Sequence, residues 1–551
     1  MQVLVCGTQR SNPNPVPDRS KTHLAPTKHP PGHCYPEEIG SRQIVRVFFV
    51  CVSLLTGVWY VSAQDVKEFE KKVTEFTLPN GLHFTVVERH NAPVVSFHTY
   101  VNAGSVDDPS GLTGLAHMFE HMAFKGTESI GTRDWAAEKR ALEIVEEIYD
   151  RLEAELAKGP KADEARVGAI RIDLQNAIDR AQTYVIPNDF TRIIEQNGGT
   201  GINADTSLDY TEYFYSLPSN RLELWFLLES QRFLHPVFRE FYKERDVVQE
   251  ENRMRVGSSP QGKLLQNFTA IAFEAFPYRN PPGGWPSDVA NLRRGNAQAF
   301  FDKYYVPANI NMAIVGDVNP AEAKRLAERY FGPMAGKPLP PLIHTHEPAQ
   351  DGPRTAVVES PSQPLEVIGY KRPDQYDKDD PVFDVVSMIL SSGRTGLLYK
   401  DMVEGKKIAL DAEAISTYPD GRYPNLFVFF LVPSLGHTVA EDQKALDDLL
   451  AKFTSKPVDA ETLQRVKTKV RAEVIRQMAS NASLAKLITM YYGAYGDWRK
   501  LFTSIDDVNH VTAADVERVA RLTFVPVSRT VAYTEPPKTA PTAVRVPGVR
   551  R

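Results

Sequence analysis

Two histidines four residues apart, with a glutamate directly before the second, form the segment HMFEH at residues 117–121. On a helix, His117 and His121 lie one turn apart on the same face, and Glu120 lies beside them. Two imidazoles in this arrangement can bind one metal ion, and the neighbouring carboxylate can deprotonate a water molecule. A short amphipathic helix with incidental histidines is the alternative, although composition alone would produce this pattern in roughly two per cent of such chains. The spacing therefore predicts a metal site whose third ligand lies elsewhere.

A later acidic segment, ERDVVQEEN, offers candidates for the missing ligand. Glu244 and Glu251 are seven residues apart, which is two helical turns, so they lie on one helix face. Glu250 lies one position off that face. A charged run of this kind is ordinarily a solvated helix. Val247 and Val248 nevertheless indicate that this helix also packs against another element.

The elements around these segments can be predicted from periodicity. Apolar residues alternate through residues 81–105, which predicts two strands, and DDPSG at residues 107–111 ends the second strand before the HMFEH helix. From Trp135 to about Ala181, apolar residues recur at steps of three and four on both sides of KGPKAD, which predicts a charged helical hairpin. We interpret this hairpin as an insertion without a catalytic role. The glycine-rich segment that follows, NGGTGINADTSLDYTEYFYSLP, predicts a strand near a sheet edge.

Composition excludes several classes of protein. The chain has 551 residues, 42% hydrophobic and 24% charged, which is typical of a globular protein with two to four domains. Its net charge of −5 gives no indication of a nucleic-acid partner. All three cysteines, Cys6, Cys34 and Cys51, lie near the N-terminus, so the main body has neither a disulfide framework nor a thiolate metal site.

The N-terminal segment reads as a leader. Residues 1–40 are rich in Pro, Ser, Asn and His without periodicity, which predicts disorder. Arg42 and Arg46 then precede an apolar run, Val47 to Val61, and the layout is that of a secretory signal peptide cleaved after Ala63. We therefore expect an exported protein, periplasmic or secreted. An uncleaved membrane anchor is the alternative, but the run is shorter than the roughly 20 residues that a span needs.

Together, HMFEH and the later ERDVVQEE resemble the motifs of the inverzincin metallopeptidases, which include pitrilysin, insulin-degrading enzyme and the mitochondrial processing peptidase. The resemblance continues in INADTSLDYTEYFYSLP and FFDKYYVPANINMAIVGDV and covers most of residues 70–540. It implies an α+β fold in which two related domains of mixed sheet plus helices face a cleft. It also implies a zinc-dependent endopeptidase acting on peptides or unfolded segments.

The resemblance implies a role for each matching residue. One zinc ion per chain would be bound by three ligands: His117, His121 and Glu251. Glu120 would be the general base, and Glu244 would orient a ligand. The separation of 251 − 121 = 130 positions exceeds the family's typical spacing by roughly the length of the helical hairpin, so the hairpin accounts for it. Glu250 stays as the alternative third ligand.

In this family the substrate joins an edge strand of the catalytic domain, which places Asn203 and Ala204 beside the substrate backbone. A second function is also considered, a non-catalytic peptide-binding or assembly subunit of a processing peptidase complex. The presence of every metal-site residue argues against this alternative.

The expected domain organisation follows from composition and from the resemblance. The expected parts are a disordered leader and signal peptide (1–63), an N-terminal zinc peptidase domain (64–335) with a helical hairpin insertion at about 133–186, a proline-rich linker (336–355), a C-terminal peptidase-like domain (356–540) and a flexible tail (541–551). The linker contains His344 and His346. We interpret them as exposed surface histidines, with a second metal site as the alternative.

One feature of single-chain relatives is missing from this sequence. Their second half supplies an arginine and a tyrosine, seven apart, that contact the substrate and the developing oxyanion. In the matching segment LLYKDMVEGKKIALDAEA these positions are Val403 and Leu410, which cannot donate a hydrogen bond. Arg394 and Tyr399 are five apart and do not match. We therefore expect a homo- or heterodimer in which a related subunit supplies the Arg/Tyr pair. Misalignment of a weakly patterned segment is the alternative.

Overall fold

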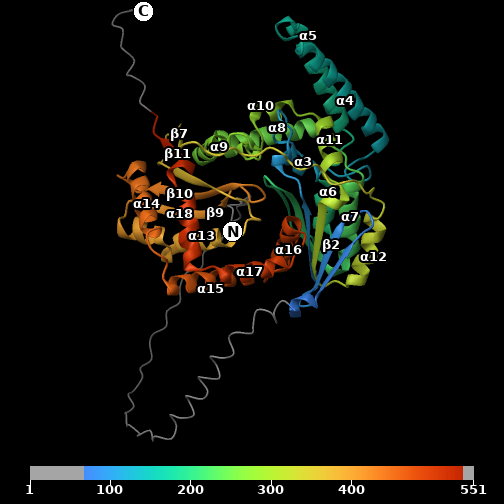
Figure 1. Cartoon of the computed structure of the whole chain (residues 1–551). Coiled ribbons are helices and arrows are strands. Elements are labelled where there is room, and N and C mark those ends of the chain that lie inside the picture. Colours follow the sequence, from blue (N-terminus) through green and yellow to red (C-terminus); the bar gives the residue numbers. More distant parts are fainter. Residues whose placement is uncertain (1–66, 538–551) are drawn as a thin grey trace, which may run out of the picture. The chain divides into compact units, whose positions relative to one another are not determined.

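The computed structural model describes residues 67–537 (Figure 1). The predicted leader, its cleavage after Ala63 and the tail 541–551 lie outside the described residues. Within them, no helix is both long and apolar enough to cross a membrane. Helices are combined with two mixed sheets, so the predicted α+β class is confirmed.

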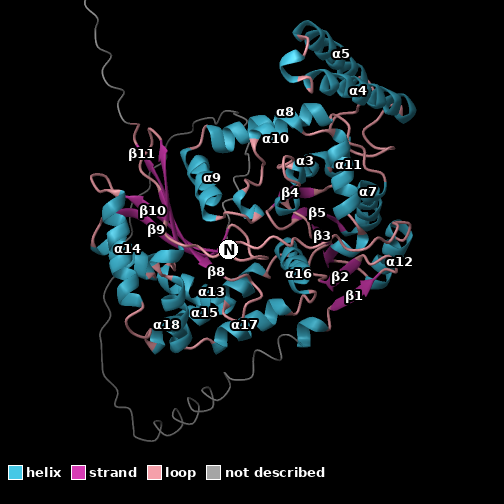
Figure 2. Ribbon diagram, turned by 45° about the horizontal axis from the view of Figure 1, so that its top comes forward, coloured by secondary structure: helices cyan, strands magenta, loops and turns pink. Residues whose placement is uncertain are grey.

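The first sheet has six strands in the order β1-β2-β6-β3-β5-β4 (Figure 2). Their bounds are β1 Val73–Thr77, β2 His83–Glu88, β3 Val94–Val101, β4 Thr200–Thr206, β5 Thr211–Pro218 and β6 Ile310–Gly316. β2 and β6 are parallel, and the other neighbours are antiparallel. β6 is buried along its whole length, as expected for a continuous apolar strand in the middle of a sheet. β4 lies at one edge, where the sequence predicted an edge strand.

The second sheet has five strands in the order β7-β11-β8-β10-β9. Their bounds are β7 Arg354–Glu359, β8 Glu366–Arg372, β9 Ala409–Tyr418, β10 Asn425–Pro433 and β11 Arg529–Glu535. β7 and β11 are parallel, and the other neighbours are antiparallel. This is the pattern of β2-β6-β3-β5-β4 in the first sheet, so β9 is the counterpart of β4. The repeat is faint in the sequence but plain in the strand order.

Helices pack on one face of the first sheet and around its ends. They are α3 Leu115–Met122, α6 Asp189–Gln196, α7 Leu222–Leu234, α8 Phe241–Asn252, α10 Pro286–Asn291, α11 Arg294–Tyr304 and α12 Pro320–Phe331. Trp225 of α7 stacks on Phe97 of β3 with ring centroids 4.6 Å apart. Both side chains are almost completely buried, so they mark the centre of the core of the first half.

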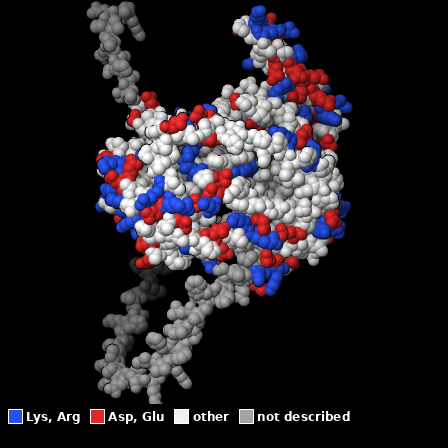
Figure 3. Space-filling view, viewed as in Figure 1, with Lys and Arg blue, Asp and Glu red and all other residues white. Residues whose placement is uncertain are grey.

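The helical hairpin consists of α4 (Trp135–Leu156) and α5 (Glu164–Gln182), which project from the first half (Figure 1). α4 buries one apolar stripe that includes Leu142 and Tyr149, whereas α5 buries little besides Ile170. Leu156, the last residue of α4, is 44% exposed. At the base, Tyr149 stacks on Tyr242 of α8 at 4.8 Å. Charged side chains of both signs cover the projecting part (Figure 3).

One helix of each half packs on the sheet of the other half. α9 (Pro260–Ala272) precedes the linker but packs on the second sheet, where Phe268 lies in one buried cluster with Val428. α16 (Asn481–Tyr495) follows the linker but packs on the first sheet, where Leu484 lies in one cluster with Val315. The segments before and after the linker thus form separate sheets, but their hydrophobic cores are joined by these two helices. The remaining helices of the second half are α13 Asp380–Leu390, α14 Val439–Phe453, α15 Ala460–Gln477, α17 Lys500–His510 and α18 Ala513–Thr523.

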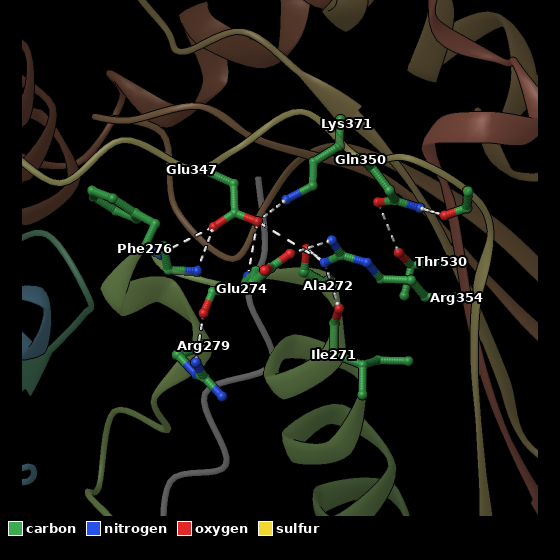
Figure 4. Close-up of polar contacts among 12 residues, drawn as sticks. Ile271, Ala272, Glu274, Phe276, Arg279, Glu347, Gln350, Arg354, Lys371 and Thr530 are labelled. Atoms are coloured by element: carbon green, nitrogen blue, oxygen red, sulfur yellow. Dashed lines mark hydrogen bonds and ion pairs between the residues drawn. The ribbon is translucent and has the colours of Figure 1, made fainter.

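The linker has no helix or strand between residues 336 and 353, yet it is fastened by side chains (Figure 4). The Glu347 carboxylate accepts hydrogen bonds from three consecutive backbone N–H groups, residues 274–276, at 2.8 to 3.0 Å. Lys371 of β8 also donates to Glu347, at 3.1 Å. His344 and His346 are exposed. The linker is thus attached both to the segment after α9 and to the second sheet.

Candidate metal centre

Side chains from outside α3 hold its N-terminus in place. The Asp108 carboxylate accepts hydrogen bonds from two backbone N–H groups of the first turn, at 2.7 and 2.9 Å, and so satisfies donors that the helix leaves free. The Thr113 hydroxyl donates to Asp288 of α10 at 2.7 Å. Gly284 packs so closely that a Cβ there would lie 2.3 Å from the Thr113 carbonyl oxygen. These contacts orient the helix that carries the histidines.

α3 and α8 bring the three predicted ligands together. His117 Nε2 lies 3.7 Å from Glu251 Oε1, and His121 Nε2 lies 3.4 Å from Glu251 Oε2. The two imidazole rings are perpendicular, with centroids 5.0 Å apart. Among the described residues, these three form the one group of His, Cys, Asp and Glu side chains whose ligand atoms all lie within 4.8 Å of one another.

This donor set fits zinc. Atoms at the corners of a tetrahedron, about 2.1 Å from a central zinc ion, are about 3.4 Å apart. Each imidazole Nε2 atom lies at a distance close to that value, 3.4 or 3.7 Å, from a different oxygen of Glu251. Two imidazoles and one carboxylate also leave one corner of the tetrahedron for water or substrate.

Burial and neighbouring charges shift the pKa values of the three residues in different directions. Burial, aided by the charge of His121, lowers the pKa of His117 to about 4. Burial also disfavours charge on His121, but hydrogen bonds to Glu244 and Glu251 outweigh it and raise the pKa of His121 to about 9. Burial opposes ionisation of Glu251, yet its contacts with both histidines lower its pKa to about 2. Metal binding requires both histidines neutral and Glu251 ionised, so His117 and Glu251 are already in the required forms and His121 must lose a proton.

Glu120 lies between the two histidines in sequence and close to β4 in space. Burial raises the pKa of its carboxyl to about 7, and the nearby Thr206 hydroxyl, which makes no hydrogen bond to another described residue, partly opposes this shift. Thr206 is the last residue of β4. Of the two residues predicted to contact substrate, Asn203 is exposed and Ala204 is buried, because successive residues of a strand point to opposite faces. A carboxyl with a pKa near 7 is suited to accept and release a proton.

A second layer of charged side chains supports His121. Its Nδ1 atom lies 3.5 Å from Glu244 Oε2, as expected for a residue that orients a ligand. Lys125 donates to Glu244 and, at 3.4 Å, to Glu240. Sequence reasoning identified Glu244 but missed Lys125 and Asp108. Lys125 follows His121 by four residues, and that spacing is the signal that could have found it.

The structure also separates the two candidates for the third ligand. The Glu250 side chain is 54% exposed and pairs with Arg253 at 2.6 Å, whereas the Glu251 side chain is 21% exposed and faces the histidines. Arg255, which sequence reasoning did not single out, forms an ion pair with Glu251 Oε1 at 2.7 Å. Glu251 is therefore the residue of the pair that lies in the site.

The positions expected to hold the Arg/Tyr pair lie in the second half. Val403 falls in the short π-helical turn Tyr399–Gly405 and packs against the second core, while Leu410 of β9 is 57% exposed. Arg394 is exposed in the turn Gly393–Thr395, and Tyr399 begins the π-helical turn. The sequence places no hydrogen-bond donor in either aligned side chain, so a partner that supplies the pair stays a prediction.

Two family models match this chain. The model described as insulinase, peptidase family M16, matches residues 84–142 and 179–283. The model described as the peptidase M16 inactive domain matches residues 291–470. The segment that the first match leaves out, between residues 142 and 179, falls within the hairpin of α4 and α5.

Individual relatives extend over most of the chain. A zinc protease named PqqE from Helicobacter pylori is 26% identical over 482 residues, which is 86% of this chain and 95% of that protein. The crystal structure of a protease from Helicobacter pylori covers 84% of this chain and 100% of its own, with a TM-score of 0.70 and 25% identity. A peptidase M16 inactive domain from Pseudomonas fluorescens has a TM-score of 0.67 at 15% identity, over 84% of this chain and 98% of that one, which shows a common fold.

Proposed function

Because the chain belongs to the pitrilysin-like M16 family of peptidases, we propose that it is a zinc-dependent endopeptidase that hydrolyses peptides or unfolded protein segments. One observation carries the proposal: three zinc-type ligands meet on α3 and α8, and a carboxyl with a raised pKa lies on the same turn of α3. His117, His121 and Glu251 would hold one zinc ion. When bound, zinc supplies Lewis-acid chemistry that activates water and polarises a scissile carbonyl.

The chain's own residues would carry out the proton transfers. Glu120 accepts a proton from the attacking water at a carboxylate oxygen and then delivers it to the nitrogen of the leaving amine. Glu244 contacts the Nδ1 atom of His121 and so orients the ring with its Nε2 atom toward Glu251. β4, the edge strand beside α3, offers unpaired backbone groups to an extended substrate, with Asn203 and Ala204 next to it.

A test of the base separates this proposal from a non-catalytic subunit. Glu120→Gln should retain zinc, measured by elemental analysis, because the three ligands stay in place. It should lose at least about 100-fold in peptide cleavage, because the base is gone. Cleavage is read by mass spectrometry on a mixed peptide library, with and without a chelator. Glu250→Gln, which changes an exposed carboxyl on the neighbouring helix, is the matched control. Unchanged turnover in Glu120→Gln would remove Glu120 from the mechanism.

An active assembly with a related subunit is also proposed. It rests on Val403 and Leu410, which replace an arginine and a tyrosine in the aligned segment. The purified chain alone should then bind zinc but cleave peptides poorly, and a related subunit that lacks HxxEH should raise the rate. Full activity from a preparation that sedimentation shows to be monomeric at assay concentration would contradict this.

Export is proposed from the N-terminal sequence. A mature chain that starts at Gln64 would contain no cysteine. N-terminal sequencing of the protein from its native host tests the cleavage site, and thiol labelling of the same material tests the loss of the leader. A labelled thiol in the processed protein would mean that the leader is retained.

A further inference from the structure

The β9–β10 turn of the second half contacts the β4–β5 turn of the first half. Asp420 accepts hydrogen bonds from the Ser207 hydroxyl and from the backbone N–H of Asp209, the latter at 3.2 Å. In return, the backbone N–H of Arg422 donates to the Asp209 carboxylate at 2.8 Å. Because β9 and β10 are the counterparts of β4 and β5, two equivalent turns of the repeat meet here. The contact is reciprocal, with each turn supplying donors and an aspartate.

The Arg422 side chain extends this contact toward α3. Its guanidinium donates to the Asp209 carbonyl oxygen and to Asn102 Oδ1, the latter at 2.5 Å. Asn102 begins the segment that leads into α3. That segment is also paired with the β4–β5 turn, because the N–H groups of Ser105 and Val106 donate to carbonyl oxygens of the turn at 3.1 and 2.9 Å. Arg422 therefore touches both chain segments that lead into the metal site.

Burial makes these polar contacts specific. Asp209 is 4% exposed, and the fully buried Tyr278 donates its hydroxyl to both Asp209 oxygens at 2.8 Å. A buried carboxylate is costly unless it is paired and hydrogen-bonded. If the β9–β10 turn moved away, Asp209 would lose the hydrogen bonds that Arg422 donates to it. The buried network therefore favours one relative position of the two turns.

The position of the β4–β5 turn matters because the turn directly follows β4, the edge strand that packs against α3. β4 has one neighbour in the sheet, β5, so its other edge is free. The position of its C-terminal end is set by the β4–β5 turn. A strand held on one side is easily displaced, and a shift of about 1 Å at a reacting centre can cost about 100-fold in rate.

We propose that Asp420 and Arg422 are positioning residues through which the second half sets β4 beside α3 for substrate pairing. This inference rests on the proposed peptidase function and deepens it. It gives the second half a role at the active site that needs no contact with the substrate. Apolar packing of α9 and α16 already joins the two halves, and buried ion pairs add little stability beyond such packing.

The test compares two arginines that join the halves. Arg422→Lys keeps the charge but loses the forked donor. Arg89→Lys is the matched control, because Arg89 also donates across the halves, to the Met478 and Ala479 carbonyl oxygens at 3.0 and 3.2 Å. Arg89 follows β2, and three strands separate β2 from β4. Asp420→Ala is the second test variant, because it removes the acceptor of the Ser207 hydroxyl and of the Asp209 N–H group.

We expect Arg422→Lys and Asp420→Ala to lower kcat/KM on extended peptides about 10- to 100-fold with zinc affinity unchanged, because no ligand is touched. Hydrogen exchange should become faster in residues 200–210 of both variants. In the Glu120→Gln background, both should also bind an uncleaved extended peptide more weakly. Arg89→Lys should change none of these beyond its effect on thermal stability.

Two outcomes overturn the inference: equal kcat/KM in Arg422→Lys and Arg89→Lys at equal thermal stability, or unchanged exchange in residues 200–210. A wild-type chain that binds zinc but cleaves no peptide, alone or with a related subunit, would instead remove the proposed function. The exchange and zinc measurements need no cleavage, so the two failures are distinguishable.

Discussion

The two halves share a five-strand order but differ in the helix that follows the central strand of the repeat, which is β3 in the first half and β8 in the second. In the first half, α3 turns two histidines and a glutamate toward α8 and β4. In the second half, α13 follows β8 and buries Val382, Val385, Val386 and Ile389 instead. One carboxylate is kept near the edge strand, since Asp384 accepts a hydrogen bond from Ser416 of β9 at 2.7 Å.

The helix that packs against each of these also differs. α8 faces α3 with Glu244 and Glu251, whereas α15 packs against α13 through buried Val466. Asp380 of α13 pairs with the buried Arg372 of β8, so the charge of this carboxylate is neutralised by a cation from the chain itself. The comparison shows that the backbone framework does not set the chemistry. A few side chains on two helices decide whether a half can hold a metal.

The largest expected effect tests whether the halves are independent. Phe268→Ala removes a fully buried ring of α9 from the core of the second sheet and should cost about 3–5 kcal/mol in the free energy of unfolding. Because α9 belongs to the first half by sequence, both halves should lose stability together in one urea transition. Leu522→Ala, at a side chain that is 68% exposed, is the control and should be near neutral. Two well-separated transitions in Phe268→Ala would mean that the halves fold independently.

The next effect tests the candidate metal site of the first half. Glu251→Gln should lower zinc affinity by more than about 100-fold, since loss of a mere supporting partner already costs about 10- to 100-fold. Glu250→Gln should leave zinc affinity unchanged, because that carboxyl faces solvent and Arg253. Calorimetric titration of the apoprotein measures both. If Glu250→Gln were the variant that lost zinc, the third ligand would be misassigned by one residue.

A smaller effect concerns the support of His121. Glu244→Gln keeps the shape of the side chain but removes the charge that faces His121 and Lys125. Zinc affinity or turnover should fall about 10- to 100-fold, the usual range for a partner of a metal ligand. Zinc titration and peptide cleavage on the same preparation would show which of the two is affected. No change in either would make Glu244 a structural residue only.

The smallest effect is expected in the second half. Asp384→Asn keeps an acceptor for Ser416, so it should lower the free energy of unfolding by less than about 1 kcal/mol, the usual contribution of one hydrogen bond. Turnover per folded molecule should stay the same, in contrast to Glu120→Gln in the first half. Thermal unfolding and peptide cleavage are measured on one preparation. A loss of cleavage comparable to that of Glu120→Gln would mean that both halves take part in the chemistry.

Much of the candidate site follows from local sequence. HMFEH places two imidazoles and a carboxylate within one helical turn whatever surrounds the helix, because the period of 3.6 residues is a property of the backbone. Glu244 and Glu251 lie on one helix face for the same reason. Alternation predicted the strands, and the glycine-rich approach to β4 predicted an edge position. The α+β class and the family follow from these local patterns.

Contacts between distant segments were decided only by the tertiary structure. The sequence left Glu250 and Glu251 as alternatives, and the rotation of α8 against α3 turns Glu251 inward while Glu250 pairs with Arg253 in solvent. The exchange of α9 and α16 between the halves was not predictable from helix periodicity, because an apolar stripe shows that a helix is buried but not which sheet buries it. The contact of Arg422 with Asp209 joins residues 213 positions apart. Its donors and acceptors find each other only when two sheets have packed, so no local pattern in either turn could have indicated it.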